Sequence, residues 1–333
     1  MNTLARTTNR RPWLTLAWLG FVLLLALSAE WLPLPYAPAT TDLAHLAEPP
    51  LANDITYPRH WLGTDPFGRD LLANLIFGAR TALLVSVPAA LLSTGLGVML
   101  GSIAGFWGDT NLRVALGYWL ALGSALLTAL LGFTGLWSTV ELLALAGFAL
   151  VVTVVTSRLP FLRRPIALPA DRLVMSAVAL LESIPRLVLV LVVAAVQEAS
   201  VFNLLLVLSF TYWTSPARLI RADLLRVKTL PYIEAARAAG LSGFSILLRH
   251  ALPNASRGVR AAFPLSIAAL IGLETTLSFL GIGLPTETAS WGRLMATVRL
   301  EPAAWWLIVE PGLLLLGTVL ALRQLAGPRP TTV

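Results

Sequence analysis

Long apolar runs alternate with short polar segments along this chain. Several of the runs contain about 18 residues or more, which is enough for an α-helix to cross a hydrocarbon core of about 30 Å. Backbone polar groups find no water inside lipid, so such segments are expected to be helices and not strands of an open sheet. The pattern therefore predicts an all-α membrane protein that crosses the bilayer several times.

Eight membrane-spanning helices are predicted from these runs. A polar segment separates the first two, and Asp65 with Pro66 is expected to start a short amphipathic helix on the outer membrane surface, continuing to about Ala79. The predicted spans are 13–32, 81–106, 113–137, 141–157, 173–196, 201–219, 261–283 and 303–322. Glycines in the second span are expected to permit close contact with another helix, namely Gly95, Gly97, Gly101 and Gly105.

Composition and charge agree with a membrane protein. The mean hydropathy is +0.78 and only 12% of residues are charged, against about 25% in soluble domains. The formal net charge of +7 would suggest a nucleic-acid partner in a soluble protein. Here it is expected instead to reflect Lys and Arg on cytoplasmic loops, so no nucleic-acid partner is predicted.

The positions of the basic residues predict the orientation. About three lie in segments assigned to the cytoplasm for each one assigned outside, which places both termini in the cytoplasm. Arg6, Arg10 and Arg11 precede the first apolar run. That run is long for a cleaved signal peptide, which is the alternative interpretation, so it is predicted to remain as the first helix.

Residue types exclude several kinds of chemistry. The chain has no cysteine, and Lys228 is its only lysine, outside any Gly-x-x-x-x-Gly-Lys motif. A nucleotide-binding P-loop needs such a lysine, so ATP hydrolysis is not expected in this chain. His45, His60 and His250 lie far apart in sequence without ligand-type spacing, so neither a metal site nor a catalytic histidine cluster is expected.

A polar, Ala-rich island around residues 232–253 is the main functional candidate. Pro231 should start a helix, and Glu234 in its first turn suits the positive end of the helix dipole. The alanines that follow leave little side chain, so a partner could approach closely. Gly240 is expected to end this helix at a positive φ angle.

A second short helix is predicted from about Ser242 to Leu252, ending at Pro253. It would carry Phe244, Leu247, Leu248 and Ala251 along one side. Two such helices could form a rigid protrusion that binds a groove on a soluble protein. An amphipathic loop lying on the lipid surface is the alternative, and the residues alone support both.

Charged residues inside predicted spans are a second group of candidates, because such charge normally faces a bundle interior or an aqueous cavity. Glu182 and Arg186 are four residues apart, so a local ion pair is favoured over lining of a solute pathway. Glu274 is expected either to hold helix packing or to line the cavity, and Glu310 is also intramembrane. An interfacial aromatic belt is expected from Trp291, Trp305 and Trp306.

Four stretches that follow one another along most of the chain resemble C-type permease subunits of the dipeptide/oligopeptide/nickel class of bacterial ABC importers. The Glu-Ala-Ala island marks such importers in general, whereas the Gly-Thr-Asp and Leu-Ser-Phe-Leu-Gly elements point to this subclass. The stretches are 60–72, 171–175 with 182–185, 232–253, and 277–283 with 290–293.

The resemblance implies a type I importer fold with six core helices and a pore shared with a second, B-type permease in the bacterial inner membrane. It implies one or two cytoplasmic ATPases that bind ATP and Mg, an external solute-binding protein, and no catalytic residue, cofactor or metal in this chain. ATPase contact is implied for residues 234–253, specifically Glu234, Ala235, Ala236, Gly240, His250, Leu252 and Pro253.

The predicted spans, together with the resemblance, suggest four parts. These are a tail with the first helix at 1–33, a periplasmic segment at 34–80, a permease domain at 81–322 and a cytoplasmic tail at 323–333, with the coupling loop at about 221–258. Two features depart from the family. About sixty inserted residues, near 111–169, are interpreted as an extra two-helix hairpin on the lipid side, and the tail lacks the usual Gly-Asp-x-Leu-Arg-Asp-type ending.

Two other functions are compared with an importer subunit. A proton- or ion-coupled transporter could use buried glutamates as a relay, but such proteins often have two similar halves and this chain shows no convincing repeat. An intramembrane hydrolase would need Ser/His or paired Asp on facing helices, and no predicted span contains Asp. For an importer, di- and oligopeptides are the favoured solutes, ahead of nickel chelates, opines, glycosides and antimicrobial peptides.

Overall fold

The computed structural model describes residues 12–51, 60–115 and 165–326, with isolated positions between 116 and 164. Helices dominate these residues, and a single sheet of two short strands accompanies them. The elements are α1 (Pro12–Ser28), α2 (Leu71–Trp107), β1 (Arg113–Ala115), β2 (Pro165–Ala167), α5 (Ala170–Glu182), α6 (Arg186–Val196), α7 (Val201–Tyr212), α8 (Thr214–Val227), α9 (Pro231–Ala238), α10 (Gly243–Ile246), η2 (Leu247–Ala251), α11 (Leu252–Phe279), α12 (Trp291–Ala296), η3 (Thr297–Arg299) and α13 (Trp306–Ala326).

The helix α2 is one continuous element of 37 residues, and the prediction of a separate amphipathic helix before it is wrong. Its N-cap is Asp70, whose side chain accepts a hydrogen bond from the Ala73 backbone N–H. Asp65 cannot cap the helix because its carboxylate accepts the backbone N–H groups of Phe67 and Arg69 within a tight turn. The residues predicted to form the separate helix after Asp70 are therefore the first turns of α2.

Close packing of α2 against α8 confirms the role predicted for three of its four glycines. A Cβ atom added to Gly101 would lie 2.3 Å from the backbone oxygen of Ala217, and Gly97 and Gly105 face α8 in the same way. Gly95 faces open space. The two backbones approach this closely because no side chain intervenes along that stripe.

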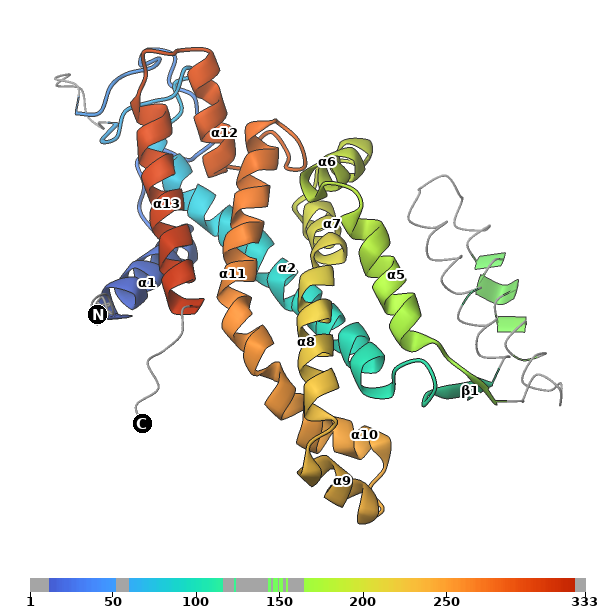
Figure 1. The fold of residues 1–333 in the computed structure, drawn as a ribbon. Coiled ribbons are helices and arrows are strands. Elements are labelled where there is room, and N and C mark those ends of the chain that lie inside the picture. Colours follow the sequence, from blue (N-terminus) through green and yellow to red (C-terminus); the bar gives the residue numbers. More distant parts are fainter. Residues whose placement is uncertain are drawn as a thin grey trace, which may run out of the picture.

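The helices run alternately between the two ends of the molecule (Figure 1). In that view α2 descends, α5 rises, α7 and α8 descend together, α11 rises and α13 descends. The helices α1 and α13 pack together, with Thr15 donating a hydrogen bond of 2.7 Å to Gln324 and Trp18 one of 3.3 Å to Thr318. The start of α1 and the end of α13 therefore lie close together, at the side of the molecule away from α5 (Figure 1).

By length and composition, three helical stretches in the described part could cross a membrane: Leu71–Trp107, Gly243–Phe279 and Trp306–Ala326. A fourth is added if α5 and α6, bent by 82°, form one span. The predicted count of eight is not confirmed. The predicted span 201–219 is divided between α7 and α8, and the spans predicted at 113–137 and 141–157 lie almost entirely outside the described residues.

A two-stranded neck, formed by residues 113–115 and 165–167, lies where the predicted insertion leaves and rejoins the bundle. Strands β1 and β2 pair antiparallel. The prediction that a helix begins at residue 113 is therefore wrong, because residues 113–115 form the strand β1. Beside them, the Asp109 carboxylate accepts the Arg172 backbone N–H at 3.0 Å and pairs with its guanidinium at 3.2 Å. The residues on either side of the insertion are thus held together.

Two of the three tryptophans predicted for an interfacial belt are core residues instead. The Trp291 side chain is 1% exposed and donates from Nε1 to the Leu75 carbonyl at 3.0 Å. Trp306 is 7% exposed and donates to the Thr64 carbonyl at 3.1 Å. Only Trp305, which is 57% exposed, has the exposure expected of a belt residue.

Candidate functional site

The predicted island forms a protruding helical knob, defined here as residues 228–251, at the lower end of the molecule (Figure 1). Gly240 ends α9 with φ of 78°, as predicted. Its N–H bonds to the Arg237 carbonyl, and the Leu241 N–H bonds to the Ala236 carbonyl. This pair of bonds is the Schellman arrangement, which turns the chain sharply and satisfies the last carbonyls of the helix.

The knob has a buried base and an exposed tip. Ile233 and Ile246 are at most 1% exposed and pack with Phe106 of α2 and Leu224 of α8 in one apolar cluster. This cluster joins the knob to the ends of two long helices. A force applied at the tip is therefore transmitted to packed core residues and not to a loose loop.

The second knob helix differs from its prediction. It does not end at Pro253, because a π-helical turn at Leu247–Ala251 leads directly into α11. The wider π turn accommodates the missing N–H of proline. Leu247 and Ala251 are buried, whereas Phe244 is 63% and Leu248 46% exposed, so the four residues predicted on one side are divided between base and surface.

The residues predicted to contact a partner divide into surface and support. Tyr232 joins α9 to the start of α11, because its hydroxyl accepts a hydrogen bond of 2.9 Å from Asn254, which also donates to the His250 carbonyl. Exposed members of the predicted set are Glu234, Ala235, Gly240 and Pro253; Ala236 is buried, and His250 and Leu252 are half-buried.

A polar joint that the sequence analysis missed lies above the knob. Arg221 forms a two-bond ion pair with Asp171, joining α8 to α5, and Lys228 Nζ donates to the Gly105 carbonyl at 3.0 Å, joining α8 to the end of α2. Burial lowers the pKa of Lys228, and the charge of Asp171 opposes that shift. The position of the single lysine at a helix end was a usable signal, since lysine commonly binds terminal helix carbonyls.

Glu182 and Arg186 do not form the predicted local pair. The helix α5 ends at Glu182 and α6 starts at Arg186, because the proline before Arg186 disfavours helix at the residue preceding it. Glu182 instead pairs with Arg218 at 2.8 Å. Arg186 lies 4.4 Å above the Tyr212 ring and donates to Ser215 at 3.4 Å.

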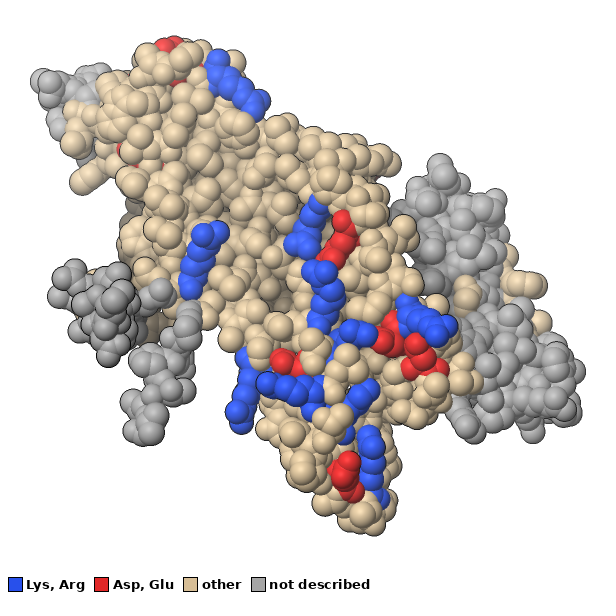
Figure 2. Space-filling model, viewed as in Figure 1, with Lys and Arg blue, Asp and Glu red and all other residues tan. Residues whose placement is uncertain are grey.

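Charged side chains gather toward one end of the face of the molecule that Figure 2 shows. Figure 2 shows most Lys and Arg of this face in its lower half, around and above the knob, and a line of charged side chains rising from there through the middle. The face is otherwise mostly uncharged. This distribution agrees with a cytoplasmic lower end and with a polar strip entering an apolar body.

Glu274 is placed to hold helix packing. Its side chain is 1% exposed and accepts hydrogen bonds from Ser278 at 2.8 Å and from Ser290, the N-cap of α12, at 2.9 Å. The carboxylate therefore ties α11 to α12 through hydroxyl groups. Among the described residues, one buried oxygen of Glu310 has no hydrogen-bond partner.

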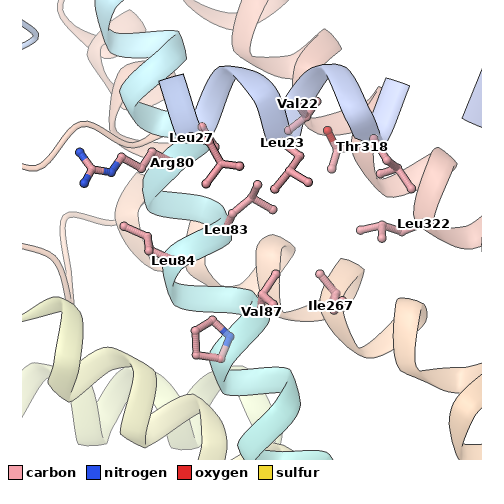
Figure 3. Close-up of a pocket in the computed structure, with 13 residues that line it drawn as sticks. Val22, Leu23, Leu27, Arg80, Leu83, Leu84, Val87, Ile267, Thr318 and Leu322 are labelled. Carbon is pink, nitrogen blue, oxygen red and sulfur yellow. The ribbon is translucent and has the colours of Figure 1, made fainter. Parts of the chain in front are cut away.

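An apolar cavity of about 500 Å³ lies between α1, α2 and α13 (Figure 3). Its lining is almost wholly aliphatic, including Val22, Leu83 and Ile267, with Arg80 and Thr318 as its polar members. A site that selects a polar solute needs several converging polar groups. The cavity is therefore a poor candidate for the solute pathway.

The expectation that the histidines lie apart is wrong for two of them. In the first loop (residues 29–70, described at 29–51 and 60–70), His45 and His60 both approach Asp42, at 2.9 Å and 3.6 Å respectively. Residues 42 and 60 are distant in sequence, which is why spacing alone did not reveal the cluster.

Comparison with known proteins agrees with the motifs. A family model described as "Binding-protein-dependent transport system inner membrane component" matches residues 167–329. A putative peptide permease protein of Brucella suis biovar 1 is 30% identical to this chain over 328 residues. The alignment covers 96% of this chain and 86% of the length of that protein. The oligopeptide transport system permease protein OppC of Bacillus subtilis is 25% identical over 283 residues, covering 84% of this chain and 72% of its own.

Proposed function

The chain belongs to the inner membrane components of binding-protein-dependent transport systems, and from this we propose that its helical knob is the docking element for a separate ATPase. It is a multi-pass, non-catalytic permease subunit of an ABC transport system. Membership of this family implies an ATPase and a binding protein as partners.

One observation carries the docking proposal: the knob presents an exposed tip on a buried base. Glu234, Ala235 and Gly240 are exposed, while Ile233 and Ile246 anchor the same turns in the core. Small side chains and exposed apolar groups at a rigid protrusion suit insertion into a groove of a soluble partner. An amphipathic loop on lipid would instead lie in the plane of the membrane surface, with its apolar side chains toward the lipid.

Affinity purification of the tagged chain with its co-expressed operon partners tests this proposal. A Gly240→Val variant should lose the ATPase, because a β-branched residue at φ of 78° costs about 1–2 kcal/mol or more and disturbs the turn. Gly240→Asn is the matched control, since asparagine tolerates this conformation, and it should retain the ATPase. Equal ATPase recovery with all three proteins would contradict the proposal.

We also propose peptides as the transported solute, with a second, B-type permease completing the pore. Relatives described as peptide permeases support this choice. Cells that carry the complete transporter should take up a labelled tripeptide, and removal of this chain alone should abolish the uptake. Uptake that is unaffected by removal would refute the assignment.

For the topology we propose six core crossings, formed by α1, α2, α5 with α6, α7 with α8, α11 and α13, with both termini and the knob in the cytoplasm. The inserted hairpin would add two peripheral crossings. The chain has no cysteine, so single cysteines at Ser242 and Glu287 report cleanly on sidedness. A membrane-impermeant maleimide should label Glu287→Cys in intact spheroplasts and Ser242→Cys only after lysis.

The strip containing Glu182, Arg186 and Arg218 is proposed to face the pathway shared with the second permease. The Arg218 side chain is 57% exposed and that of Glu182 26% exposed, and charge is rarely left facing hydrocarbon. An Arg186→Ala variant should therefore lower peptide uptake while the complex still assembles. Loss of assembly without a change in uptake per assembled complex would assign the strip to the subunit contact alone.

A further inference from the structure

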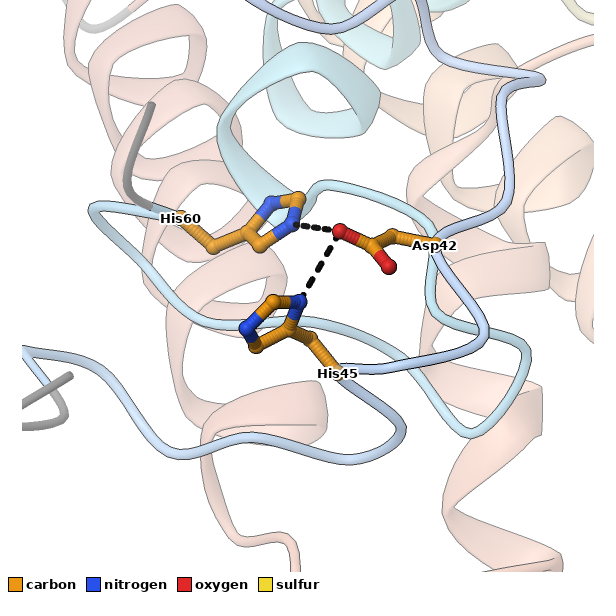
Figure 4. Close-up of side chains that lie close together, drawn as sticks. All are labelled: Asp42, His45 and His60. Atoms are coloured by element: carbon orange, nitrogen blue, oxygen red, sulfur yellow. Dashed lines mark hydrogen bonds and ion pairs between the residues drawn. The ribbon is translucent and has the colours of Figure 1, made fainter. Parts of the chain in front are cut away.

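Three potential metal ligands meet in the first loop at the end of the molecule opposite the knob. Asp42, His45 and His60 each offer one ligand atom, and these atoms lie within 4.8 Å of one another. Figure 4 shows the Asp42 carboxylate directed between the two imidazole rings. Its Oδ2 atom lies 2.9 Å from His45 Nδ1 and 3.6 Å from His60 Nε2.

The His60 ring is held in place from behind. Its side chain is 3% exposed, and Nδ1 lies 2.9 Å from Asp70 Oδ1. The other oxygen of Asp70 accepts the Ala73 N–H at the start of α2, so the carboxylate is fixed by the helix cap. Tyr36 stacks on the ring with 4.1 Å between centroids. A carboxylate behind a histidine that fixes its ring and tautomer is a common feature of metal sites.

This arrangement leaves an electrostatic problem that a cation would solve. A neutral His60 that donates from Nδ1 to Asp70 has its lone pair on Nε2, and Nε2 is buried with no hydrogen-bond partner in the described part of the chain. That lone pair is directed toward the Asp42 carboxylate. Two acceptors that face each other, the buried Nε2 and the half-buried Asp42 carboxylate, repel, and a metal ion between them replaces repulsion with two bonds.

We propose that Asp42, His45 and His60 bind one divalent transition-metal ion, with Zn²⁺ as the best match. Zinc takes imidazole nitrogen at about 2.0–2.1 Å and carboxylate oxygen at about 2.0–2.2 Å, which separates tetrahedral ligand atoms by about 3.4 Å. The separations of Asp42 Oδ2 from the two imidazole nitrogens, 2.9 Å and 3.6 Å, bracket that value, and the nitrogens lie within 4.8 Å of each other. Two imidazoles with one carboxylate suit zinc better than magnesium or calcium, which prefer oxygen ligands.

The ion would join two parts of the first loop to the start of α2. Asp42 and His45 come from one part of this loop, whereas His60 leads through Asp70 into the helix. Three protein ligands leave a fourth position for water. Bound zinc is therefore expected to stabilise the loop at this end of the molecule, because an ion that binds only the folded state raises its stability.

Metal titration of the full-length chain in mild detergent, purified without a histidine tag, tests the site. Zinc measured against a chromogenic chelator should bind at one equivalent, and Co²⁺ should give the intense visible absorption of four-coordinate cobalt. His45→Asn and Asp42→Asn should remove this binding. Asp70→Asn keeps a capping side chain and should weaken binding by roughly 10–100-fold.

Two controls separate this site from other sources of binding. His250→Asn removes the remaining histidine, in the knob, and Glu287→Gln removes an exposed carboxylate; both should bind zinc as the wild type does. Thermal unfolding in the presence of a chelator shows whether each variant is folded, and zinc should raise the midpoint of the wild type but not of His45→Asn. Absence of stoichiometric binding, or binding that persists in folded His45→Asn and Asp42→Asn, would overturn the proposal.

Discussion

At the scale of single residues, Glu274 shows how a carboxylate can be accommodated inside an apolar bundle. It is 1% exposed, and burial of an ionisable group is costly unless hydrogen bonds compensate. Thr275 and Ser278 of α11 donate to it, and so does Ser290 at the start of α12. The four side chains form one unit, so removal of the acceptor also leaves three buried hydroxyls without this partner.

A Glu274→Ala substitution should therefore lower the free energy of unfolding by about 1–3 kcal/mol, the cost of leaving buried polar groups unsatisfied. Thermal unfolding in detergent measures the change. The exposed Glu287 lies nearby in sequence, and Glu287→Ala should stay within about 0.5 kcal/mol of the wild type. Similar midpoints for the two variants would show that the hydroxyl network contributes little.

At the scale of elements, the contact between α2 and α8 depends on the absence of side chains. A methyl group at Gly101 would lie 2.3 Å from the Ala217 carbonyl oxygen, so the helices must separate to admit it. Gly95, on the same helix, has open space beside it. The two glycines differ only in what they face, which makes them a matched pair.

Gly101→Ala should destabilise the protein by about 1–3 kcal/mol through overpacking. Gly95→Ala should be neutral or stabilise by up to about 1 kcal/mol, because alanine favours helix over glycine. Thermal unfolding of both variants in the same detergent checks the difference. If Gly95→Ala were the more harmful substitution, the proposed packing of α2 on α8 would be wrong.

The inserted segment can be tested as a separable element. The antiparallel register pairs Arg113 with Ala167, and the Asp109–Arg172 contact lies outside that neck. Replacing residues 116–164 with a short Gly/Ser turn should therefore leave membrane insertion of the rest intact. Membrane fractionation and co-purification of partners measure the outcome, and loss of all assembly would show that the hairpin is integral to the transporter.

At the scale of the whole molecule, the knob and the proposed zinc site lie at opposite ends of the bundle (Figure 1). Such an arrangement suits a subunit that receives energy at one face and solute at the other. Peptide uptake should stop when cellular ATP is depleted and continue when only the proton gradient is collapsed. The opposite pattern would favour a relay through the buried glutamates over coupling to an ATPase.

Local sequence patterns were sufficient for much of this description. The Ala-rich run ending in Gly240 predicted a short helix with a left-handed cap, which depends on interactions within a few residues. The glycine stripe of α2 predicted a close helix contact, which depends on the absence of side chains. The motif order also indicated the family. Membrane hydropathy alone did not settle the number of crossings, because polar residues and bends interrupt several helices.

Only the tertiary structure decided which distant side chains meet. Glu182 and Arg186 were expected to pair because an unbroken helix would align them, yet a bend assigns Glu182 to Arg218. Asp42 and His60 meet because the first loop folds back onto the start of α2. Such contacts depend on the relative placement of whole elements, whereas caps, turns and apolar stripes depend on neighbouring residues. The sequence therefore determined the interactions between residues close together in the chain, and the fold determined those between residues far apart in it.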